Sequence, residues 1–445
     1  MDDETRRLLD AAERLIASAL AAGADAADAA VVRSRSRGAS VRLGKVEDTE
    51  SSESEDVSLR VFVGRRVATV SADIRAEIGP LVERAVAMAK VSPEDPFASL
   101  ADPALLARDQ LDLDLFDPTE IESAALVEEA LALEDAARAI PGVSNSGGAG
   151  ASVGVSGLVL VTSGGFSGWR MRSAFSRSVS VIAGDGVKMQ RDYDYDSRIH
   201  AADLEASAEI GRRAGERTVR RLGPRKVPTG RYPIVFDPRV SRGLIGHVVG
   251  AINGAAIARK TSFLKDRMGE RVLPDTMSIT DEPLLARRSG SRAFDGEGVR
   301  GAPLTLVANG VLESWILDTA TGRELGLASN ARASRSSGGV SPSSTNVVVT
   351  PGSLDPEALV RETGRGIYVT ELIGQGVNLV TGDYSRGISG FMIENGELTY
   401  PVSEVTIAGN LAEMLLDLTA ANDLDTRYSV VAPTLRVGTM TVAGD

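Results

Sequence analysis

The chain has two histidines, His200 and His247, and no cysteine among its 445 residues. A zinc site that uses sulfur or three histidines is therefore excluded, and so is a cysteine nucleophile. A Ser-His-Asp triad would have only these two histidines from which to draw its base. Any metal bound by this chain would have to rest mostly on carboxylates.

His247 lies in a segment, residues 238–257, that the sequence predicts to be one helix. Asp237 would cap this helix, Pro238 would take its first position, and apolar residues recur at helical spacing. A metalloprotease helix needs two histidines on one face, with a glutamate beside the first to activate water. This segment has one histidine, and no glutamate lies between Asp237 and Lys265. It cannot hold zinc in that way, and His247 alone is better interpreted as a hydrogen-bonded structural histidine.

His200 follows the acidic run Asp192-Tyr-Asp-Tyr-Asp196, whose alternating carboxylates have the chemistry to hold Ca²⁺. A calcium loop requires glycine at its sixth position and glutamate at its twelfth. Counted from Asp192, those positions hold Ser197 and Asp203. We therefore expect an exposed acidic strand or loop rather than a calcium site.

Two glycine-rich patterns resemble catalytic motifs but lack their context. Gly147–Gly150 does not have the dinucleotide-binding spacing and no helix follows it, so we expect a turn. Gly150-Ala-Ser-Val-Gly154 matches the nucleophile elbow, which needs a strand before it and a helix after it. Turns and strands are predicted on both sides, so Ser152 is not expected to be catalytic.

Residues 381–391 form a turn-rich segment that carries Asp383, Tyr384 and Arg386 close together. A loop that presents polar side chains from a β scaffold is a common way to build a binding site. A structural loop stabilised by an ion pair between Asp383 and Arg386 explains the same residues, and the sequence leaves both interpretations open. Arg259, in the run Ala258–Phe263, is a further candidate for a peptide or partner contact.

The elements that must position these residues follow from hydrophobic periodicity and turn signals. Residues 328–345 are rich in Ser, Gly and Ala and are predicted to be a long mobile loop. Asn309-Gly310 and Asn395-Gly396 are predicted hairpin turns. The other predicted elements are helices at 3–21, 74–90, 202–221 and 409–420, a helix from Asp117 to about Ile140, strands at 29–44, a hairpin at 56–70 and alternating strands at 151–190.

Helix breakers at 223–230 mark the best boundary along the chain. We expect two domains: residues 1–222 as an N-terminal mixed α+β domain with antiparallel strands, and residues 231–445 as a β-rich C-terminal domain that carries the helix at 238–257. The predicted fold class is therefore α+β.

Composition excludes some classes of partner. The formal charge of −12 argues against nucleic-acid binding, which requires basic patches. No run of about 18 apolar residues is present, so no membrane span is expected. The acidic start, Met1-Asp-Asp-Glu4, is unlike a signal peptide, and the expected compartment is the cytoplasm.

Six longer motifs occur in order along the second half of the chain. They are Gly246–Ala251 (GHVVGA), Arg259–Phe263 (RKTSF), Phe294–Arg300 (FDGEGVR), Thr370–Gly376 (TELIGQG), Thr381–Gly387 (TGDYSRG) and Tyr400–Asn410 (YPVSEVTIAGN). With these motifs the chain resembles the TldD/PmbA family, the modulators of DNA gyrase, and more narrowly its PmbA (TldE) branch. The resemblance spans nearly the whole chain and is strongest from 230 to 445.

The resemblance implies one half of a cytoplasmic, heterodimeric metalloprotease that acts on unfolded peptides. In the family, the TldD branch carries a His-Glu-x-x-x-His helix and supplies the zinc. At the matching positions this chain has Gly246 for the first histidine, His247 for the glutamate and Ala251 for the second histidine. The resemblance therefore implies the subunit without metal, with no cofactor of its own and zinc on a TldD-type partner.

Three functions remain open from the sequence. The leading hypothesis is a non-catalytic subunit that completes the peptide channel of a TldD-type partner, with contacts expected at His247, Arg259, Asp383, Tyr384 and Arg386. The second is a self-sufficient peptidase with a non-zinc mechanism, in which a carboxylate or His247 is the base. The third is a homodimeric peptide-binding protein without activity, since the chain could self-associate when the partner is absent.

Overall fold

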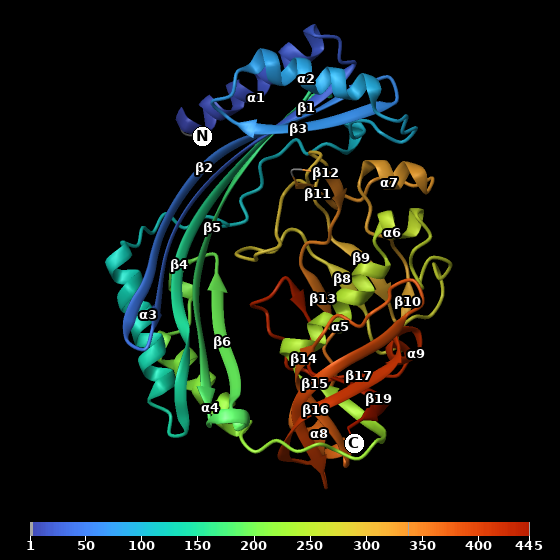
Figure 1. The fold of residues 1–445 in the computed structure, drawn as a ribbon. Coiled ribbons are helices and arrows are strands. Elements are labelled where there is room, and N and C mark those ends of the chain that lie inside the picture. Colours follow the sequence, from blue (N-terminus) through green and yellow to red (C-terminus); the bar gives the residue numbers. More distant parts are fainter. Residues whose placement is uncertain (1–2, 337, 445) are drawn as a thin grey trace.

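The computed structural model describes residues 3–336 and 338–444. Two halves of the chain lie beside each other (Figure 1). Residues 3–222 form one long curved sheet with helices on it, and residues 223–444 form a five-stranded sheet, a six-stranded sheet and a short hairpin. Helices accompany mainly antiparallel strands throughout, which confirms the α+β fold class.

The first half alternates helices and long strands in a simple order. Its elements are α1 (Asp3–Ala21), β1 (Ala26–Arg42), β2 (Lys45–Val63), β3 (Arg66–Asp73), α2 (Ile78–Val91), α3 (Ser123–Arg138), β4 (Val143–Thr162), β5 (Ser167–Ala183), β6 (Gln190–Arg198) and α4 (Ser207–Arg220). The helices predicted at 74–90 and 202–221 are present, although each begins about one turn later than expected.

The strands of the first half run in the order β3-β2-β1-β4-β5-β6, and each is antiparallel to its neighbours. β4 is 20 residues long, and over this length the sheet curves into the arch seen in Figure 1. Gly147–Gly150 lie inside β4, so the turn predicted there is wrong. The register slips between Ser146 and Gly148, and the φ of 106° at Gly148 suits a bulge in a continuous strand.

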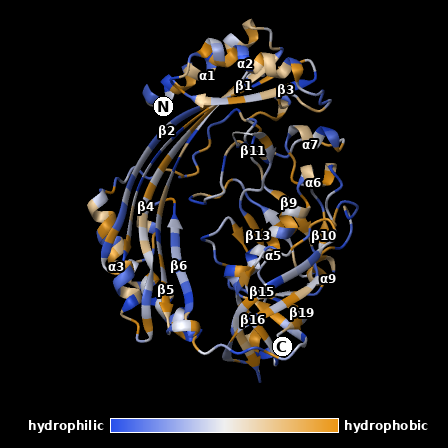
Figure 2. Ribbon diagram, viewed as in Figure 1, coloured by the Kyte–Doolittle hydropathy of each residue, from blue (hydrophilic) through white to orange (hydrophobic). Residues whose placement is uncertain are grey.

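The two faces of this sheet differ in chemistry because side chains alternate along each strand. The outer face is apolar: α1 and α2 cover it around Ala29 and Val31, and α3 and α4 cover it around Ala39 and Val41. The inner face, turned toward the second half, carries small polar residues such as Ser34 of β1. Figure 2 shows the resulting bands of hydrophobic and hydrophilic residues along the strands.

The second half is built from shorter elements. They are β7 (Gly230–Phe236), α5 (Pro238–Ala251), α6 (Gly254–Ala258), β8 (Ile279–Asp281), β9 (Leu304–Ala308), β10 (Val311–Leu312), α7 (Thr319–Glu324), β11 (Ala333–Ser336), β12 (Gly339–Pro342), β13 (Val347–Val349), α8 (Pro356–Thr363), β14 (Gly366–Ile373), β15 (Asp383–Glu394), β16 (Glu397–Asn410), α9 (Leu411–Leu416), β17 (Leu418–Ala420), β18 (Val430–Val431) and β19 (Leu435–Ala443).

Two sheets of the second half share one core with α5. The sheets have the orders β10-β9-β8-β13-β18 and β16-β15-β14-β7-β19-β17. Both Asn-Gly turns close hairpins as predicted, β9–β10 and β15–β16, with positive φ at Asn309 and Asn395. Ile234 of β7, Leu244 of α5 and Val347 of β13 belong to the same buried cluster. This packing places α5 in the core that the two sheets share.

Three predicted elements are wrong or displaced. The helix predicted from Asp117 begins at Ser123, because the Asp117 carboxylate accepts hydrogen bonds from the backbone N–H groups of Thr119 and Ala201 and so joins two loops. Within 328–345, β11 and β12 form a hairpin instead of a mobile loop, and Ser337 lies outside the described residues. The helix predicted at 409–420 is only α9, since β17 follows it and pairs with β19.

Candidate functional site

Helix α5 carries Gly246, His247 and Ala251, which stand at the positions of the metalloprotease motif. The carboxylate of Asp237 accepts a hydrogen bond from the backbone N–H of Arg239 at 2.9 Å, and Pro238 takes the first helical position. His247 lies beside the buried stripe and is half-buried. The residues of that stripe are Ser241, Leu244, Ile245, Val248 and Ala251.

The single helix predicted over 238–257 is in fact two helices, α5 and α6. Asn253 separates them, because its side chain caps α6 by accepting a hydrogen bond from Ala255 N at 3.0 Å. Gly254 N–H donates to the Ile316 carbonyl, which is outside the helix. Periodicity did not reveal this break, although Asn-Gly within the apolar run was a signal for it.

The three positions of the degenerate motif have different environments. A Cβ added at Gly246 would meet no atom within 4 Å, whereas Ala251 is completely buried. The ring of His247 lies edge-on to that of Tyr384, with 6.1 Å between the centroids. Burial lowers the pKa of His247, and the nearby Arg386 guanidinium lowers it further. His247 is therefore neutral at pH 7.

His247 lines a cavity of about 320 Å³ between the two halves, formed by β6, α5 and β14. Asp192 and Glu371 are its carboxylates, and guanidinium groups bind both. Arg239 Nη1 lies 3.0 Å from Asp192, and Arg221 contacts Asp192 at 3.4 Å and also pairs with Glu371. Since both acids are already neutralised, neither is free to hold a cation or to act as a base.

The described residues do not fit a zinc ion. Gly246 has no side chain where a first ligand would stand, and His247 faces the positive charge of Arg386. Across 3–336 and 338–444, no group of three or more His, Asp or Glu side chains is arranged to hold a metal ion. Zinc sites in proteins use three or four such ligands, and the described side chains do not supply them.

Asp383, Tyr384 and Arg386 lie at the start of β15, which pairs with β16, so the predicted loop is a strand. Alternation places Tyr384 and Arg386 on one side and Asp383 on the other. Burial raises the pKa of Tyr384 to about 12. Asp383 accepts a hydrogen bond from Thr381 Oγ1 at 2.6 Å, and among the described residues it forms no ion pair with Arg386. The alternative of a loop held by that pair is therefore wrong.

Arg259 stands apart from the other candidates. It is the C-cap residue of α6, and within the described part of the chain its side chain makes no hydrogen bond or ion pair. It does not line the cavity at His247. The structure therefore brings together His247, Tyr384 and Arg386, and leaves Asp383 and Arg259 outside that group.

The acidic run of β6 is buried, which contradicts the prediction of an exposed segment. Asp192, Asp194 and Asp196 are at most 4% exposed. Arg213 and Arg217, one turn apart on α4, both contact Asp194, the second at 3.0 Å. The sequence did contain a matching pattern, because acidic residues recur every two positions in the strand and arginines recur every four positions in the helix. Only tertiary packing, however, brings the two elements together.

A second cavity, of about 670 Å³, was not anticipated from the sequence. It lies between the inner face of the long sheet and loops of the second half. Arg170 and Arg172 of β5 line it, together with Arg292 and Arg335, and no Asp or Glu is among its lining residues. The only sequence signal was the Arg-x-Arg spacing, which places Arg170 and Arg172 on one face of a strand.

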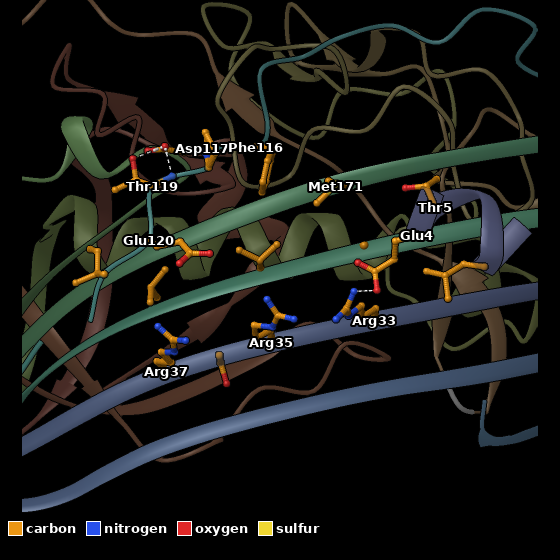
Figure 3. Close-up of a pocket in the computed structure, with 17 residues that line it drawn as sticks. Glu4, Thr5, Arg33, Arg35, Arg37, Phe116, Asp117, Thr119, Glu120 and Met171 are labelled. Atoms are coloured by element: carbon orange, nitrogen blue, oxygen red, sulfur yellow. Dashed lines mark hydrogen bonds and ion pairs between the residues drawn. The ribbon is translucent and has the colours of Figure 1, made fainter. Parts of the chain in front are cut away.

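A third cavity, of about 220 Å³, lies on the outer face between α1 and residues 116–121 (Figure 3). Arg33, Arg35 and Arg37 project into it from β1, as the close-up shows. Each of these arginines has an acidic partner, among them Glu4 for Arg33. Its charges are thus balanced within the chain, unlike those of the cavity that contains Arg170.

No helix among the described residues is long and apolar enough to cross a membrane.

Comparison with known proteins identifies related sequences along nearly the whole chain. The sequence profile of the PmbA/TldA metallopeptidase C-terminal domain matches residues 229–444, that of the central domain matches 116–222, and that of domain 1 matches 27–89. Metalloprotease PmbA of Escherichia coli O157:H7 is 36% identical over 99% of this chain and 97% of its own length. A Metalloprotease PmbA homolog of Haemophilus influenzae has the same identity and coverage.

Solved structures show the same architecture. A protein from Bacteroides thetaiotaomicron, described as a modulator of DNA gyrase, superposes with a TM-score of 0.91 over 100% of both chains, at 28% identity. TldE from Thermococcus kodakarensis superposes with a TM-score of 0.86 over 98% of this chain and 100% of its own, and at 23% identity it shows the fold alone. The sequence relationship to the PmbA proteins, together with this fold, shows that the chain belongs to the PmbA/TldD metallopeptidase family.

Proposed function

We propose that this chain is the non-catalytic subunit of a cytoplasmic, heterodimeric zinc peptidase, and that a TldD-type partner holds the zinc. One observation carries the proposal. At the family's motif positions on α5 the chain has Gly246, His247 and Ala251, and arginines neutralise both carboxylates in the adjoining cavity. A helix in the motif's place that lacks both the glutamate and a pair of histidines suits a binding role.

In this proposal the chain binds and orients an unfolded peptide while hydrolysis takes place at the partner's zinc. β6 is an edge strand whose one neighbour in the sheet is β5, and Tyr193 of β6 lines the cavity at His247. Such an edge can pair with the backbone of an extended peptide and leaves its side chains free. His247 and Arg386 are then the nearest candidate contacts, and Arg259, Asp383 and Tyr384 stay predicted contacts to the peptide or the partner.

Co-expression with a TldD-type partner tests the proposal. We expect the two chains to elute together from gel filtration and the pair to hydrolyse an unfolded peptide. Activity should disappear when the glutamate of the partner's motif is replaced by glutamine. His247→Gln in this chain should raise KM and leave kcat unchanged, because His247 would contact the peptide and take no part in its hydrolysis. Two chains that elute separately, or a complex without peptidase activity, would overturn the proposal.

The same preparation separates the alternatives. Hydrolysis of unfolded peptides by this chain alone, free of metal, would instead support a self-sufficient peptidase with His247 or a carboxylate as base. A chain that self-associates, binds peptide and ignores the partner would be a homodimeric binding protein. Self-association by itself does not decide the matter, since a partner can displace one copy, so partner binding is the measurement that matters.

A further inference from the structure

The cavity of about 670 Å³ between the halves has an unbalanced charge. Of its four arginines, Arg335 is paired with Asp28 at 2.6 Å. The guanidinium groups of Arg170, Arg172 and Arg292 form no ion pair within the described residues, and their hydrogen bonds go to backbone carbonyls instead. These carbonyls belong to Phe294 for Arg170, to Ser289 and Ser291 for Arg172, and to Ser343 for Arg292.

Two buried arginines elsewhere in the chain are paired with carboxylates. Arg332 is completely buried and pairs with Asp281, and Arg60 lies 2.6 Å from Asp28. Arg292 is buried, and Arg170 and Arg172 are half-buried. A charge withdrawn from water without an ion-pair partner is costly, so three such arginines around one cavity need a reason. Burial lowers the pKa of Arg170 to about 9, and repulsion from Arg292 and Arg172 adds to this shift while the Asp295 carboxylate opposes it. Arg170 is still positively charged at pH 7.

Arg292 also has a buried hydrogen-bond donor without a partner, which is an observation independent of the charges. It is 9% exposed, and its Nε has no hydrogen-bond partner in the described structure. Hydroxyl groups complete the lining and can donate to an anion; they belong to Ser156, Ser344 and Ser429. A volume of about 670 Å³ is within the range of ligand sites, which is roughly 300–1,000 Å³.

The geometry points to a carboxylate-binding site in this cavity, in which Arg170, Arg172 and Arg292 hold an acidic group of the bound peptide. The planar fork of a guanidinium matches a carboxylate in two hydrogen bonds. The inference rests on the proposed peptide-binding function. The carboxylate can come from two sources, the C-terminus of the peptide or an Asp or Glu side chain.

Binding of labelled peptides to the full-length chain alone, followed by fluorescence anisotropy, tests the site. The probes are one alanine-rich hexapeptide with a free C-terminus, its C-terminal amide, and the amide with a central Glu or Gln. We expect at least one carboxylate form to bind about tenfold or more tightly than its neutral counterpart, as charged hydrogen bonds imply. The form that gains affinity identifies the source of the carboxylate.

Variants then assign this preference to the arginines. Arg172→Gln should abolish the difference between acidic and neutral peptides, and Arg172→Lys should restore it only in part because an ammonium lacks the fork. Ser344→Glu leaves all three arginines in place and should also weaken binding of the acidic peptide. Arg35→Gln removes a charge from the outer face of the same sheet and should change nothing.

The inference is overturned if acidic and neutral peptides bind equally, or if Arg172→Gln and Ser344→Glu both keep the preference. It is also overturned if inorganic phosphate binds at the arginines and no peptide carboxylate does. Because this assay contains no partner, its failure is distinct from failure of the proposed heterodimer, which co-elution measures. Thermal unfolding of each variant separates loss of binding from loss of fold.

Discussion

Arg335 of β11 and Asp28 of β1 form an ion pair across the two halves, with 2.6 Å between Nη2 and Oδ1. Asp28 also accepts hydrogen bonds from Arg60 Nε and Nη2 at 2.8 and 2.6 Å. Arg60 in turn lies 3.2 Å from Glu297 of the second half. Asp28 is completely buried, so this network joins the halves where water cannot replace its contacts.

Replacing Asp28 by asparagine should destabilise the chain by about 3–5 kcal/mol, because Arg335 loses its counter-charge and Arg60 keeps only Glu297. The free energy of unfolding, from urea denaturation at pH 7, measures the effect. Asp73→Asn is the control: Asp73 pairs with Arg75 on the surface, and its loss should leave the midpoint unchanged. Equal stability of Asp28→Asn and the parent chain would contradict a structural role for the pair.

His247 should make stability depend on pH. Burial and Arg386 lower its folded pKa below the ordinary value of 6.5, so the unfolded chain binds more protons in the window below that value. The contribution to stability is therefore present above about pH 6.5 and is lost as the pH falls through the folded pKa. Melting temperatures of the parent chain and His247→Gln should change relative to each other between about pH 7 and pH 5, with the parent losing more. A constant difference would refute the shift.

Restoring motif residues should not create a zinc site. Gly246→His should be tolerated, because a Cβ at this position meets no atom within 4 Å. Ala251→His enlarges a completely buried residue and should cost about 1–3 kcal/mol through overpacking. We expect no stoichiometric zinc in the variant with both changes and His247→Glu, measured by metal analysis after dialysis. Tight zinc binding by that variant would show that the site is intact apart from its ligands.

The junction between α5 and α6 should tolerate no Cβ at Gly254. An added Cβ there would lie 2.8 Å from the Ile316 carbonyl oxygen and 2.7 Å from Leu317 Cδ2, so Gly254→Ala should destabilise the chain by about 1–3 kcal/mol. Gly243→Ala is the matched control on α5, where a Cβ meets nothing within 4 Å. It should be neutral or stabilise by up to about 1 kcal/mol. Equal unfolding midpoints for the two variants would contradict this close approach.

Local patterns predicted much of the secondary structure. α1, the β2–β3 hairpin and both Asn-Gly turns follow from short-range periodicity and turn chemistry. The predictions of secondary structure fail where contacts between residues distant in the sequence determine the local conformation. The Asp117 side chain accepts a hydrogen bond from Ala201 instead of capping a helix. Gly254 N–H donates to the carbonyl of Ile316, which is too distant in the sequence for a local pattern to reveal.

In the candidate site, too, some features follow from the residue types and others only from the tertiary structure. The residue types alone determined that His247 stands on α5 without a second histidine or a nearby glutamate in the helix, and ligand chemistry depends on residue type before geometry. Only the tertiary structure decided that Asp192 is neutralised by Arg221 and Arg239, and that Arg170 shares a cavity with Arg292 from the other half. Electrostatic interactions depend on distance and burial in three dimensions, and neither can be read from the order of residues.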